Sequence, residues 1–190
     1  MSLPTLPIGV DGWSLRAWRD SDVDALADHA GRPEVWRNMS DSFPHPYTRE
    51  IARHWVERGH VEFGGDNWAI AHHDHAVGGC GIAVQGGSLR CNAEIGYWLA
   101  PHCWGRGIGT AVARTLSDRA FEDPLVTRVF APVHAYNPAS LRVLEHCGFE
   151  REGLLRLSAL KAGTVIDRVL MARYRPGPAG DIPVLPTLAT

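Results

Sequence analysis

Short runs of alternating apolar and polar residues dominate the first half of this 190-residue chain, and such alternation is typical of half-buried β-strands. The alternation predicts strands over residues 13–18, 67–71, 76–85 and 89–99. His/Asp and Gly-Gly turns separate the last three strands, which suits antiparallel hairpins. Between the first two strands, helices are predicted over residues 20–30 and about 48–62.

In the second half of the chain, the spacing of apolar residues changes to that of helices. Ile108, Val112, Leu116 and Ala120 recur at every fourth position and predict a helix over about residues 107–121. A second helix is expected to begin at Asn137-Pro138 and to end at Gly148, because Asn caps, Pro suits the first turn and Gly ends helices. Strands are predicted around these helices over residues 127–134, 149–157 and 165–174.

The order strand, helix, strand requires a crossover connection, so the sheet is expected to be mixed, antiparallel early and parallel around residues 107–121. The predicted fold class is α+β, a central and mostly antiparallel sheet flanked by helices. Residues 1–174 are expected to form a single domain. Residues 175–190 hold four prolines and are expected to form an extended tail.

The composition narrows the classes of function. A formal net charge of -2 offers no electrostatic reason to bind nucleic acid, and no apolar run reaches the roughly 18 residues that span a bilayer. The four cysteines form no C-x-x-C pair and no signal-like leader is visible, which favours a cytoplasmic protein with reduced thiols. The cluster His72-His73-Asp74-His75 lies between two predicted strands and is interpreted as a hairpin turn, so no metal site is expected.

Three glycines at alternate positions lead into the predicted helix at residues 107–121, and they form the most informative motif of the chain. The motif consists of Trp104, Gly105, Arg106, Gly107, Ile108, Gly109 and Thr110. Glycine permits positive φ and a close approach of the backbone, and the free N–H groups at the start of a helix attract anions. The motif therefore indicates a phosphate-binding turn, with a turn that merely ends a strand as the alternative.

Read together, three segments resemble the GNAT family of acetyl-CoA-dependent N-acetyltransferases, and most closely its RimJ/RimL-type branch. They are residues 94–99 (EIGYWL), the loop at 104–110 (WGRGIGT), and residues 137–149, which start with NPAS and end with GF. The resemblance covers roughly residues 13–174. Trp104 stands where the general loop pattern has Gln or Arg, as is frequent in the ribosomal-protein branch. The resemblance implies that backbone amides from Gly105 through Thr110 hold the pyrophosphate of coenzyme A, with Arg106 adding a cation.

The resemblance also implies the GNAT fold, in which the strand ending near Leu99 and the strand starting near Thr127 splay apart. The pantetheine arm would lie in the gap and bond to free backbone groups. Tyr97, Trp98 and Leu99 are expected to line the gap, although ordinary core packing also accounts for their side chains. A backbone N–H near Trp98 or Leu99 is expected to polarise the thioester oxygen.

Asn137 and Ser140 match positions at which the family contacts the coenzyme near its thioester, although helix capping explains Asn137 equally well. Many family members carry a Tyr seven residues after this Asn that is thought to protonate the departing thiolate, but Leu144 occupies that position here. Ser140 therefore becomes the candidate catalytic acid. The alternative is a helix-surface serine that only touches the coenzyme.

The attacking amine also needs a base, and Glu94 is the candidate, since partial burial in an apolar strand raises the pKa of a carboxyl group. The alternative for Glu94 is an ion pair with Arg90 or Arg142. Asp167 is the reserve base, because the Rim-type branch often has an acid near the acceptor there.

The remaining histidines and cysteines have weaker cases for a function. His134 and His146 are each candidate proton relays. Cys91 and Cys147 are interpreted as small apolar thiols, because direct transfer requires no acetyl-cysteine.

The predicted function is direct transfer of acetyl from acetyl-CoA to a primary amine, a protein N-terminal α-amine or a small-molecule amine, in a ternary complex. Residues 33–62 are expected to build the acceptor side with the aromatic residues Trp36, Phe43, Tyr47 and Trp55, although packing explains these as easily. The alternative from another class is an acyl-CoA-binding sensor or interaction protein with this fold and no turnover. The resemblance favours a monomer or homodimer.

Overall fold

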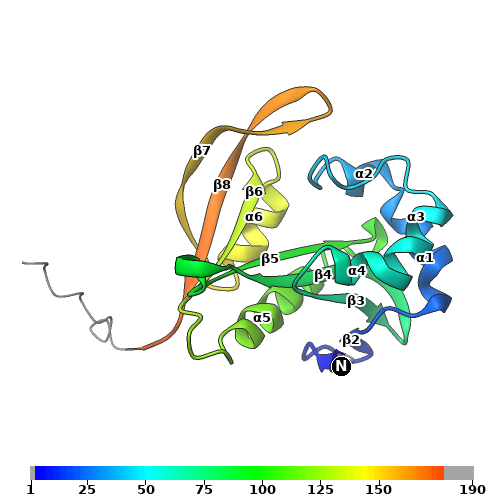
Figure 1. Ribbon diagram of the computed structural model, residues 1–190, viewed down its shortest axis with the longest axis horizontal. Helices are drawn as coiled ribbons and strands as arrows, with labels where there is room; N and C mark the ends of the chain where they lie inside the picture. Colours follow the sequence, from blue (N-terminus) through cyan, green and yellow to red (C-terminus); the bar gives the residue numbers. More distant parts are fainter. Residues whose placement is uncertain (1–2, 178–190) are drawn as a thin grey trace, which may run out of the picture.

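An eight-stranded sheet in the order β1-β2-β3-β4-β5-β6-β8-β7 forms the centre of the computed structural model, which describes residues 3–177 (Figure 1). Only the pair β5 and β6 is parallel within those residues; the other neighbours are antiparallel. The strands are β1 (Leu6–Pro7), β2 (Trp13–Arg16), β3 (Asp66–His72), β4 (His75–Val84), β5 (Asn92–Leu99), β6 (Arg128–His134), β7 (Glu150–Lys161) and β8 (Thr164–Tyr174). The predicted mixed sheet and α+β class are confirmed.

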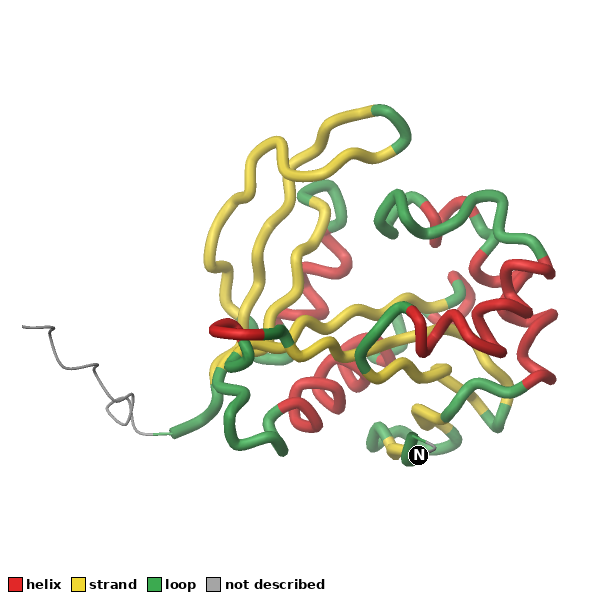
Figure 2. Tube along the Cα trace, in the orientation of Figure 1, coloured by secondary structure: helices red, strands yellow, loops and turns green. Residues whose placement is uncertain are grey.

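Residues 3–177 include six α-helices, labelled in Figure 1 and drawn in red in Figure 2. They are α1 (Val23–Ala30), α2 (Pro33–Trp36), α3 (Arg49–His54), α4 (His60–Glu62), α5 (Ile108–Ala120) and α6 (Pro138–Glu145). The helix predicted over residues 48–62 is present, but it widens into a π turn over Trp55–Gly59 between α3 and α4. Thr48 begins it, because its side-chain oxygen accepts a hydrogen bond from the Ile51 N–H at 3.3 Å.

Sequence periodicity missed α2 and β1 and placed the end of β7 too early. The first two elements span four and two residues, which is too short for a period to show. β7 continues past residue 157 to Lys161 through an irregularity at which Leu157 adopts a φ of 50°. The Leu157 N–H there donates to Asp167 Oδ1 at 2.7 Å, which holds the irregular strand in the sheet.

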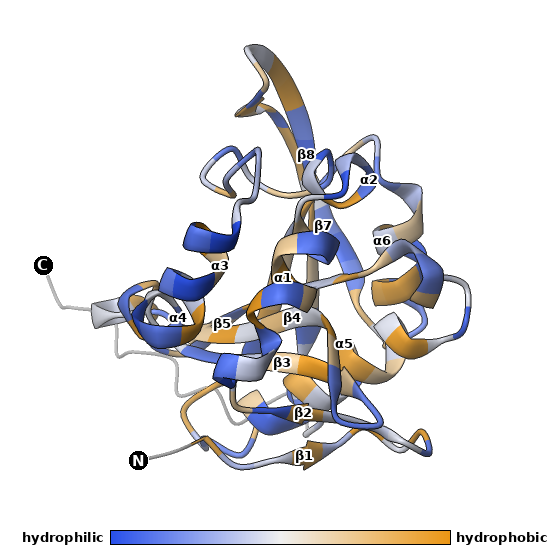
Figure 3. Cartoon of the chain, turned by 90° about the vertical axis from the view of Figure 1, so that its right-hand side faces the viewer, coloured by the Kyte–Doolittle hydropathy of each residue, from blue (hydrophilic) through white to orange (hydrophobic). Residues whose placement is uncertain are grey.

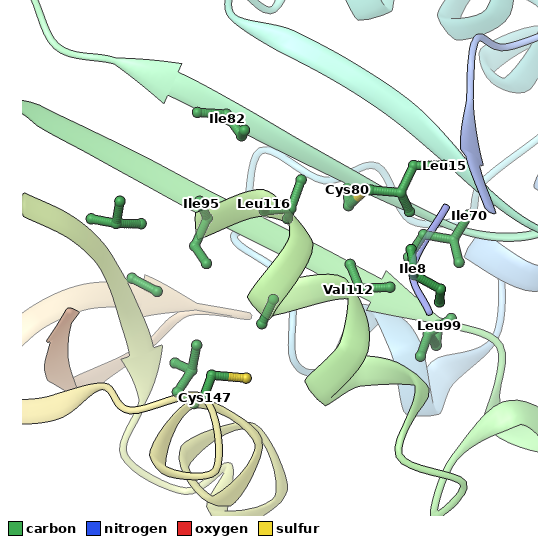
Figure 4. Close-up of a cluster of buried hydrophobic side chains, with 14 of the residues drawn as sticks. Ile8, Leu15, Ile70, Cys80, Ile82, Ile95, Leu99, Val112, Leu116 and Cys147 are labelled. Atoms are coloured by element: carbon green, nitrogen blue, oxygen red, sulfur yellow. The ribbon is translucent and has the colours of Figure 1, made fainter. Parts of the chain in front are cut away.

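The sheet carries a separate buried cluster on each face. Alternate strand residues such as Ile70 and Ile95 pack with Val112 and Leu116 of α5 in the larger cluster, part of which Figure 4 shows. α1 and α3 cover the other face, where Leu26 of α1 belongs to the smaller cluster. Figure 3 shows apolar residues gathered in the central strands and α5, and polar residues on α3 and α4. One face of the sheet is therefore packed against α5 and the other against α1 and α3.

The parallel ladder between β5 and β6 is short. It comprises Asn92 opposite Arg128, Ala93 opposite Val129 and Glu94 opposite Phe130, after which the two strands are no longer paired. β5 residues 95–99 remain bonded to β4 on their other side. The predicted splay is therefore confirmed, and it leaves a free backbone edge on the last five residues of β5.

Hydrogen bonds at both ends of β5 show which backbone groups face the gap. The Gln85 N–H bonds the Asn92 carbonyl and the Ala100 N–H bonds the Val77 carbonyl, so even-numbered residues point toward β4. The Cys91 carbonyl accepts from the Thr127 N–H on the β6 side. Because backbone groups alternate along a strand, the N–H and C=O of Tyr97 and Leu99 face the gap.

The His72–His75 cluster forms the tight turn between β3 and β4, as predicted. His73 and Asp74 both have positive φ, 43° and 71°, which suits a two-residue hairpin turn. Within residues 3–177, no group of three or more His, Cys, Asp or Glu side chains is placed to hold a metal ion. Asp74 instead pairs with Arg19 at 2.6 Å.

A single sheet runs through residues 6–174, and its division from a tail at residue 175 stays a prediction. Residues 178–190 of the expected proline-rich tail lie outside the described residues. None of the helices in the described part of the chain has both the length and the apolarity that a membrane crossing needs.

The buried ion pair between Arg16 and Asp22 offers a test of how α1 is attached to the sheet. Their paired bonds measure 2.7 and 2.8 Å, and both side chains are under 5% exposed. We expect Asp22→Asn to lower the unfolding free energy by about 3 kcal/mol, because the buried Arg16 guanidinium then keeps only the exposed carboxylate of Asp74, 3.2 Å from its Nε. Thermal denaturation should show a fall of roughly 10 °C. The exposed neighbour provides the control: Asp20→Asn should change the melting temperature little, and equal losses would contradict the assignment.

Candidate functional site

The glycine motif forms an exposed loop with unoccupied backbone donors. Gly105 and Gly107 have φ values of 73° and 76°, and Gly107 caps α5. In residues 3–177, none of the six successive N–H groups from Gly105 to Thr110 donates to a protein acceptor; the Ala111 N–H is the first that does. Six free donors thus lie at the positive end of a 13-residue helix, an arrangement that favours anions.

One apolar contact and one hydrogen bond hold this loop in place. The Ile108 side chain is 2% exposed and packs in the larger core cluster, so the start of α5 is held against the hydrophobic core. The Trp104 indole is half exposed, and its Nε1–H donates to the Leu99 carbonyl at 2.8 Å. Trp104 thereby ties the loop to the free edge of β5.

The first turn of α6 meets β5 at a small polar centre. The hydroxyls of Tyr97, on β5, and Ser140, in the first turn of α6, are 3.1 Å apart. Asn137 caps α6, since its Oδ1 accepts from the Ser140 N–H at 3.1 Å. Gly109 lies beside the Tyr97 ring and Val143, and a Cβ added there would be in ordinary van der Waals contact with both. Four of the predicted coenzyme-side residues are therefore brought together.

Position 144 offers no hydroxyl and no room for one. The Leu144 side chain is fully buried in the larger core cluster. The hydroxyl present near Ser140 is instead that of Tyr97, and burial raises the pKa of Tyr97 above its usual value. The Tyr97 side chain therefore stays a neutral O–H in any ordinary buffer.

Glu94 stands at the point where β5 and β6 separate, on the opposite face of the sheet from Tyr97. Strand alternation places Glu94 with Trp98, which packs against the smaller cluster, and away from Ile95 and Tyr97. Burial raises the pKa of the Glu94 carboxyl, and the charge of Arg168 partly opposes this shift. Among the described residues, neither alternative arginine proposed from the sequence forms an ion pair with Glu94.

Asp167 is occupied elsewhere. Its carboxylate accepts the Leu157 N–H at the irregular part of β7, and it alternates with Arg168 along β8. Arg168 lies directly opposite His134 of β6 and shares its face of the sheet. Asp167 therefore points to the other face, away from Glu94.

His134 is held by a short chain of hydrogen bonds. The Tyr136 hydroxyl donates to the Arg37 carbonyl at 2.5 Å and lies 2.9 Å from His134 Nδ1. The imidazole is 8% exposed; burial lowers its pKa, and the charges of Lys161 and Arg168 lower it further. His134 is therefore a neutral imidazole with a fixed orientation.

The hairpin of β7 and β8 reaches across to the segment after α2, as Figure 1 shows. Lys161, the single lysine of the chain, places its Nζ 3.9 Å from the centre of the Trp36 ring and 3.5 Å from Asp41 Oδ1. The Ala162 N–H donates to the same Asp41 oxygen at 3.1 Å. These contacts hold the hairpin tip against residues 36–41.

Two small cavities lie beside α2, and one of them reaches the glycine loop at Trp104. The first has a volume of about 250 Å³ and is lined by Glu34, Arg37, Asn38, Trp104, Tyr136 and Asn137. It therefore joins residues expected on the coenzyme side with residues expected on the acceptor side. The second measures about 210 Å³ and is lined by His29, Arg32, Glu34, Pro101 and His102.

The four aromatic residues expected on the acceptor side divide into two kinds. Tyr47, Phe43 and Trp55 pack in the smaller cluster, so the packing interpretation fits them. Trp36 stacks on His45 with ring centres 4.4 Å apart, and the Lys161 ammonium makes a cation–π contact with its ring. Trp36 is the aromatic residue that faces the hairpin.

The remaining candidate groups lie apart from the site or serve packing. Cys147 is buried, and its Sγ donates to the Thr110 carbonyl at 3.1 Å. Cys91 is exposed just before β5. His146 is exposed at the C-terminal end of α6, at the opposite end of that helix from Ser140.

Sequence reasoning missed Tyr136, Lys161 and Arg168 as neighbours of the site. The hydrogen-bond partner of Tyr136 is 99 positions away, so no local sequence pattern predicts the contact. A signal did exist for Lys161, because a lone lysine in a chain rich in arginine is unusual. Arg168 is placed by the register of β8 against β6, and that register cannot be obtained from the sequence.

Comparisons with known proteins give a consistent result. Residues 14–150 match the acetyltransferase (GNAT) domain family. "Uncharacterized N-acetyltransferase p20" of Bacillus licheniformis is 29% identical over 163 residues, which cover 81% of this chain and 88% of that protein.

Solved structures share the fold. Mycobacterium smegmatis RimJ, in complex with CoA-disulfide, is 27% identical with a TM-score of 0.76, over 96% of this chain and 88% of that one. RimL, a ribosomal L7/L12 alpha-N-protein acetyltransferase in complex with coenzyme A, has a TM-score of 0.77 at 22% identity, over 90% and 98% of the two chains.

The contact between Tyr97 and Ser140 can be tested by stability alone. We expect Ser140→Ala to lower the unfolding free energy by about 1–2 kcal/mol, because it leaves the Tyr97 hydroxyl without its partner. Tyr97→Phe should cost about 1 kcal/mol, and the double variant should be less destabilised than the sum by roughly 1 kcal/mol. Urea unfolding of the four proteins measures this coupling. Strictly additive effects would show that the two hydroxyls do not bond.

Proposed function

Because this chain belongs to the GNAT family of acetyltransferases, we propose that it transfers acetyl from acetyl-CoA directly to a primary amine in a ternary complex. The observation that carries the proposal is that, within the described residues, no strand pairs with the gap-facing backbone groups of β5 and that the N–H groups of the glycine loop are free; of the β5 groups, the Leu99 carbonyl accepts from Trp104. An elongated ligand with a pyrophosphate at one end and amide groups along its arm matches these groups.

On the donor side, the N–H groups from Gly105 to Thr110 would hold the pyrophosphate, and exposed Arg106 would add a cation. The pantetheine arm would extend along β5 as an added strand and bond to Tyr97 and Leu99. Trp98 would contribute packing, because its backbone groups bond to β4. The oxyanion donor near the end of β5 is therefore assigned to the Leu99 N–H rather than to that of Trp98.

Glu94 is proposed as the base that acts on the acceptor amine through water. It lies on the acceptor face, and its raised pKa makes it a better proton acceptor than an exposed carboxylate. Occupation of the Asp167 carboxylate by the Leu157 N–H favours Glu94 over the reserve candidate.

Ser140 is proposed as the acid that protonates the departing thiolate, with Tyr97 as its hydroxyl partner. The Ser140 Oγ lies beside the gap, near the capping residue Asn137. A hydroxyl of ordinary pKa donates weakly, so the link to Tyr97 matters because it orients the proton.

The acceptor is proposed to be a protein N-terminal α-amine or a small-molecule amine, which the cavity beside Arg37 and Tyr136 would receive. A screen of acetyl-CoA turnover against N-terminal peptides, polyamines, aminoglycosides and amino-acid amides tests this. Release of free coenzyme A with any of these amines supports the proposal. Tight acetyl-CoA binding without release would indicate the sensor alternative. A cytoplasmic location and a monomer or homodimer stay predictions.

The free N–H groups of the glycine loop predict the effect of one substitution at Gly107. We expect Gly107→Asp to abolish acetyl-CoA binding measured by calorimetry, because it sets a carboxylate among the free N–H groups. Gly9 has a similar φ of 73°, and neither glycine has an atom within 4 Å of the added Cβ. Gly9→Asp therefore carries the same strain and charge, and it should bind as the original protein does. Binding that survives in the Gly107 variant would show that the glycine loop does not hold the pyrophosphate.

The base assignment predicts a pH effect. Since Glu94 works as a carboxylate with a raised pKa, activity should rise with pH through a value above 4.5. We expect Glu94→Gln to lower kcat roughly 100-fold and to remove this limb of the pH profile, with the acetyl-CoA Kd unchanged. The exposed Glu150→Gln serves as the matched control. An unchanged pH profile in the Glu94 variant would exclude this residue as the base.

A further inference from the structure

The proposed chemistry leaves the attacking nitrogen with a second proton to lose, and the structure offers a group for it. Glu94 lies beside the closed end of the gap, level with Phe130. His134 is four residues past Phe130 on β6, and Trp98 is four residues past Glu94 on β5, so the two lie equally far along the separating strands. At about 3.3 Å per residue, that is roughly 13 Å beyond Glu94. His134 is thus level with the part of β5 assigned to the thioester.

Strand alternation gives the direction of the His134 side chain. Val129, Ala131 and Val133 pack in the larger cluster with α5, so Phe130 and His134 face the other side of the sheet. Glu94 faces that side as well. His134 therefore shares the acceptor face with the proposed base.

The hydrogen bonds of Tyr136 determine the tautomer of His134. A phenol has one proton, and Tyr136 uses it on the Arg37 carbonyl, which can only accept. The 2.9 Å contact with His134 Nδ1 must then be donated by the imidazole. Nδ1 consequently carries the hydrogen, and Nε2 keeps its lone pair.

The lone pair of Nε2 is unused by the protein. Within residues 3–177 no hydrogen-bond donor contacts Nε2. Nε2 is also absent from the fully buried side-chain atoms that lack a partner, so it is not closed off from ligands. Lys161 of β7, Arg168 of β8 and Asp41 of the segment after α2 are the charged groups that act on the ring. Burial is the main cause of the lowered pKa of His134; with the two cations it outweighs the carboxylate and keeps the imidazole neutral, which is the form that accepts a proton.

We infer that His134 Nε2 accepts the proton of the nitrogen that has attacked the thioester, an assignment that rests on the proposed function. A chain of water molecules along the gap first carries a proton from the acceptor ammonium to Glu94. The neutral amine then bonds to the carbonyl carbon and becomes cationic, and Nε2 takes its proton. The C–S bond breaks, and the thiolate takes a proton from Ser140. Water reprotonates Ser140 and receives the protons of Glu94 and His134, so one proton is released per turnover.

The first test needs no acceptor. Nitrogen NMR of histidine-labelled protein, with the signal assigned by its loss in His134→Asn, reports which ring nitrogen carries hydrogen. We expect Nδ1–H with a bare Nε2 at neutral pH, and Tyr136→Phe should increase the other tautomer. An Nε2–H form in the unsubstituted protein would overturn the inference.

The second test uses turnover with an amine accepted in the screen. Asn keeps an amide donor for Tyr136 but has no base, so His134→Asn should lower kcat about 100-fold with acetyl-CoA affinity unchanged. The pH profile should lose the limb that titrates below the ordinary histidine value, and added imidazole should partly restore His134→Gly. His146→Asn, at an exposed position, is the control and should retain full activity.

The outcomes separate this inference from the proposed function. If the unsubstituted protein turns over and His134→Asn keeps more than half its kcat with the same pH profile, the role of His134 is wrong and the proposed function stands. If the unsubstituted protein binds acetyl-CoA but acetylates no amine, the proposed function fails and the role of His134 fails with it. Melting curves of each variant exclude loss of folding as the cause.

Discussion

The early end of the ladder between β5 and β6 is the constraint on which the site depends. A backbone N–H or C=O that finds no partner costs free energy, so a strand edge left open in the middle of a sheet must be met by water or by a ligand. Three residue pairs hold the strands together up to Glu94, and β4 then holds β5 alone. An unpaired central edge is a place for an extended ligand with amide groups.

The elements around the gap support that opening from both faces. On one face, α5 and α6 begin beside it, and the bond between Tyr97 and Ser140 joins β5 to the first turn of α6. On the other face lie Glu94, His134 and Arg168, with the hairpin of β7 and β8 held against residues 36–41 by Lys161. Acetyl donor chemistry and proton removal are thus assigned to opposite sides of one sheet.

Much of this arrangement could be predicted because its signals are local. The glycine loop, the apolar stripe of α5 and the Asn-Pro cap of α6 are each read from neighbouring residues, and all three are present. α2 and β1 are too short to show a period, and the irregular turn of β7 at Leu157 breaks the alternation that would have revealed its length. The candidate site was predicted best where backbone groups carry it, at Gly105 to Thr110.

The sequence by itself determined the mixed sheet, the free donors at the start of α5 and the family to which the chain belongs, because each follows from local spacing and motif order. Tertiary structure alone decided how the side chains combine. Tyr97 meets Ser140 across 43 positions, Tyr136 meets the Arg37 carbonyl across 99, and Leu144 proves to be core. Such pairings depend on strand register and crossover, which fix distances that no local pattern contains.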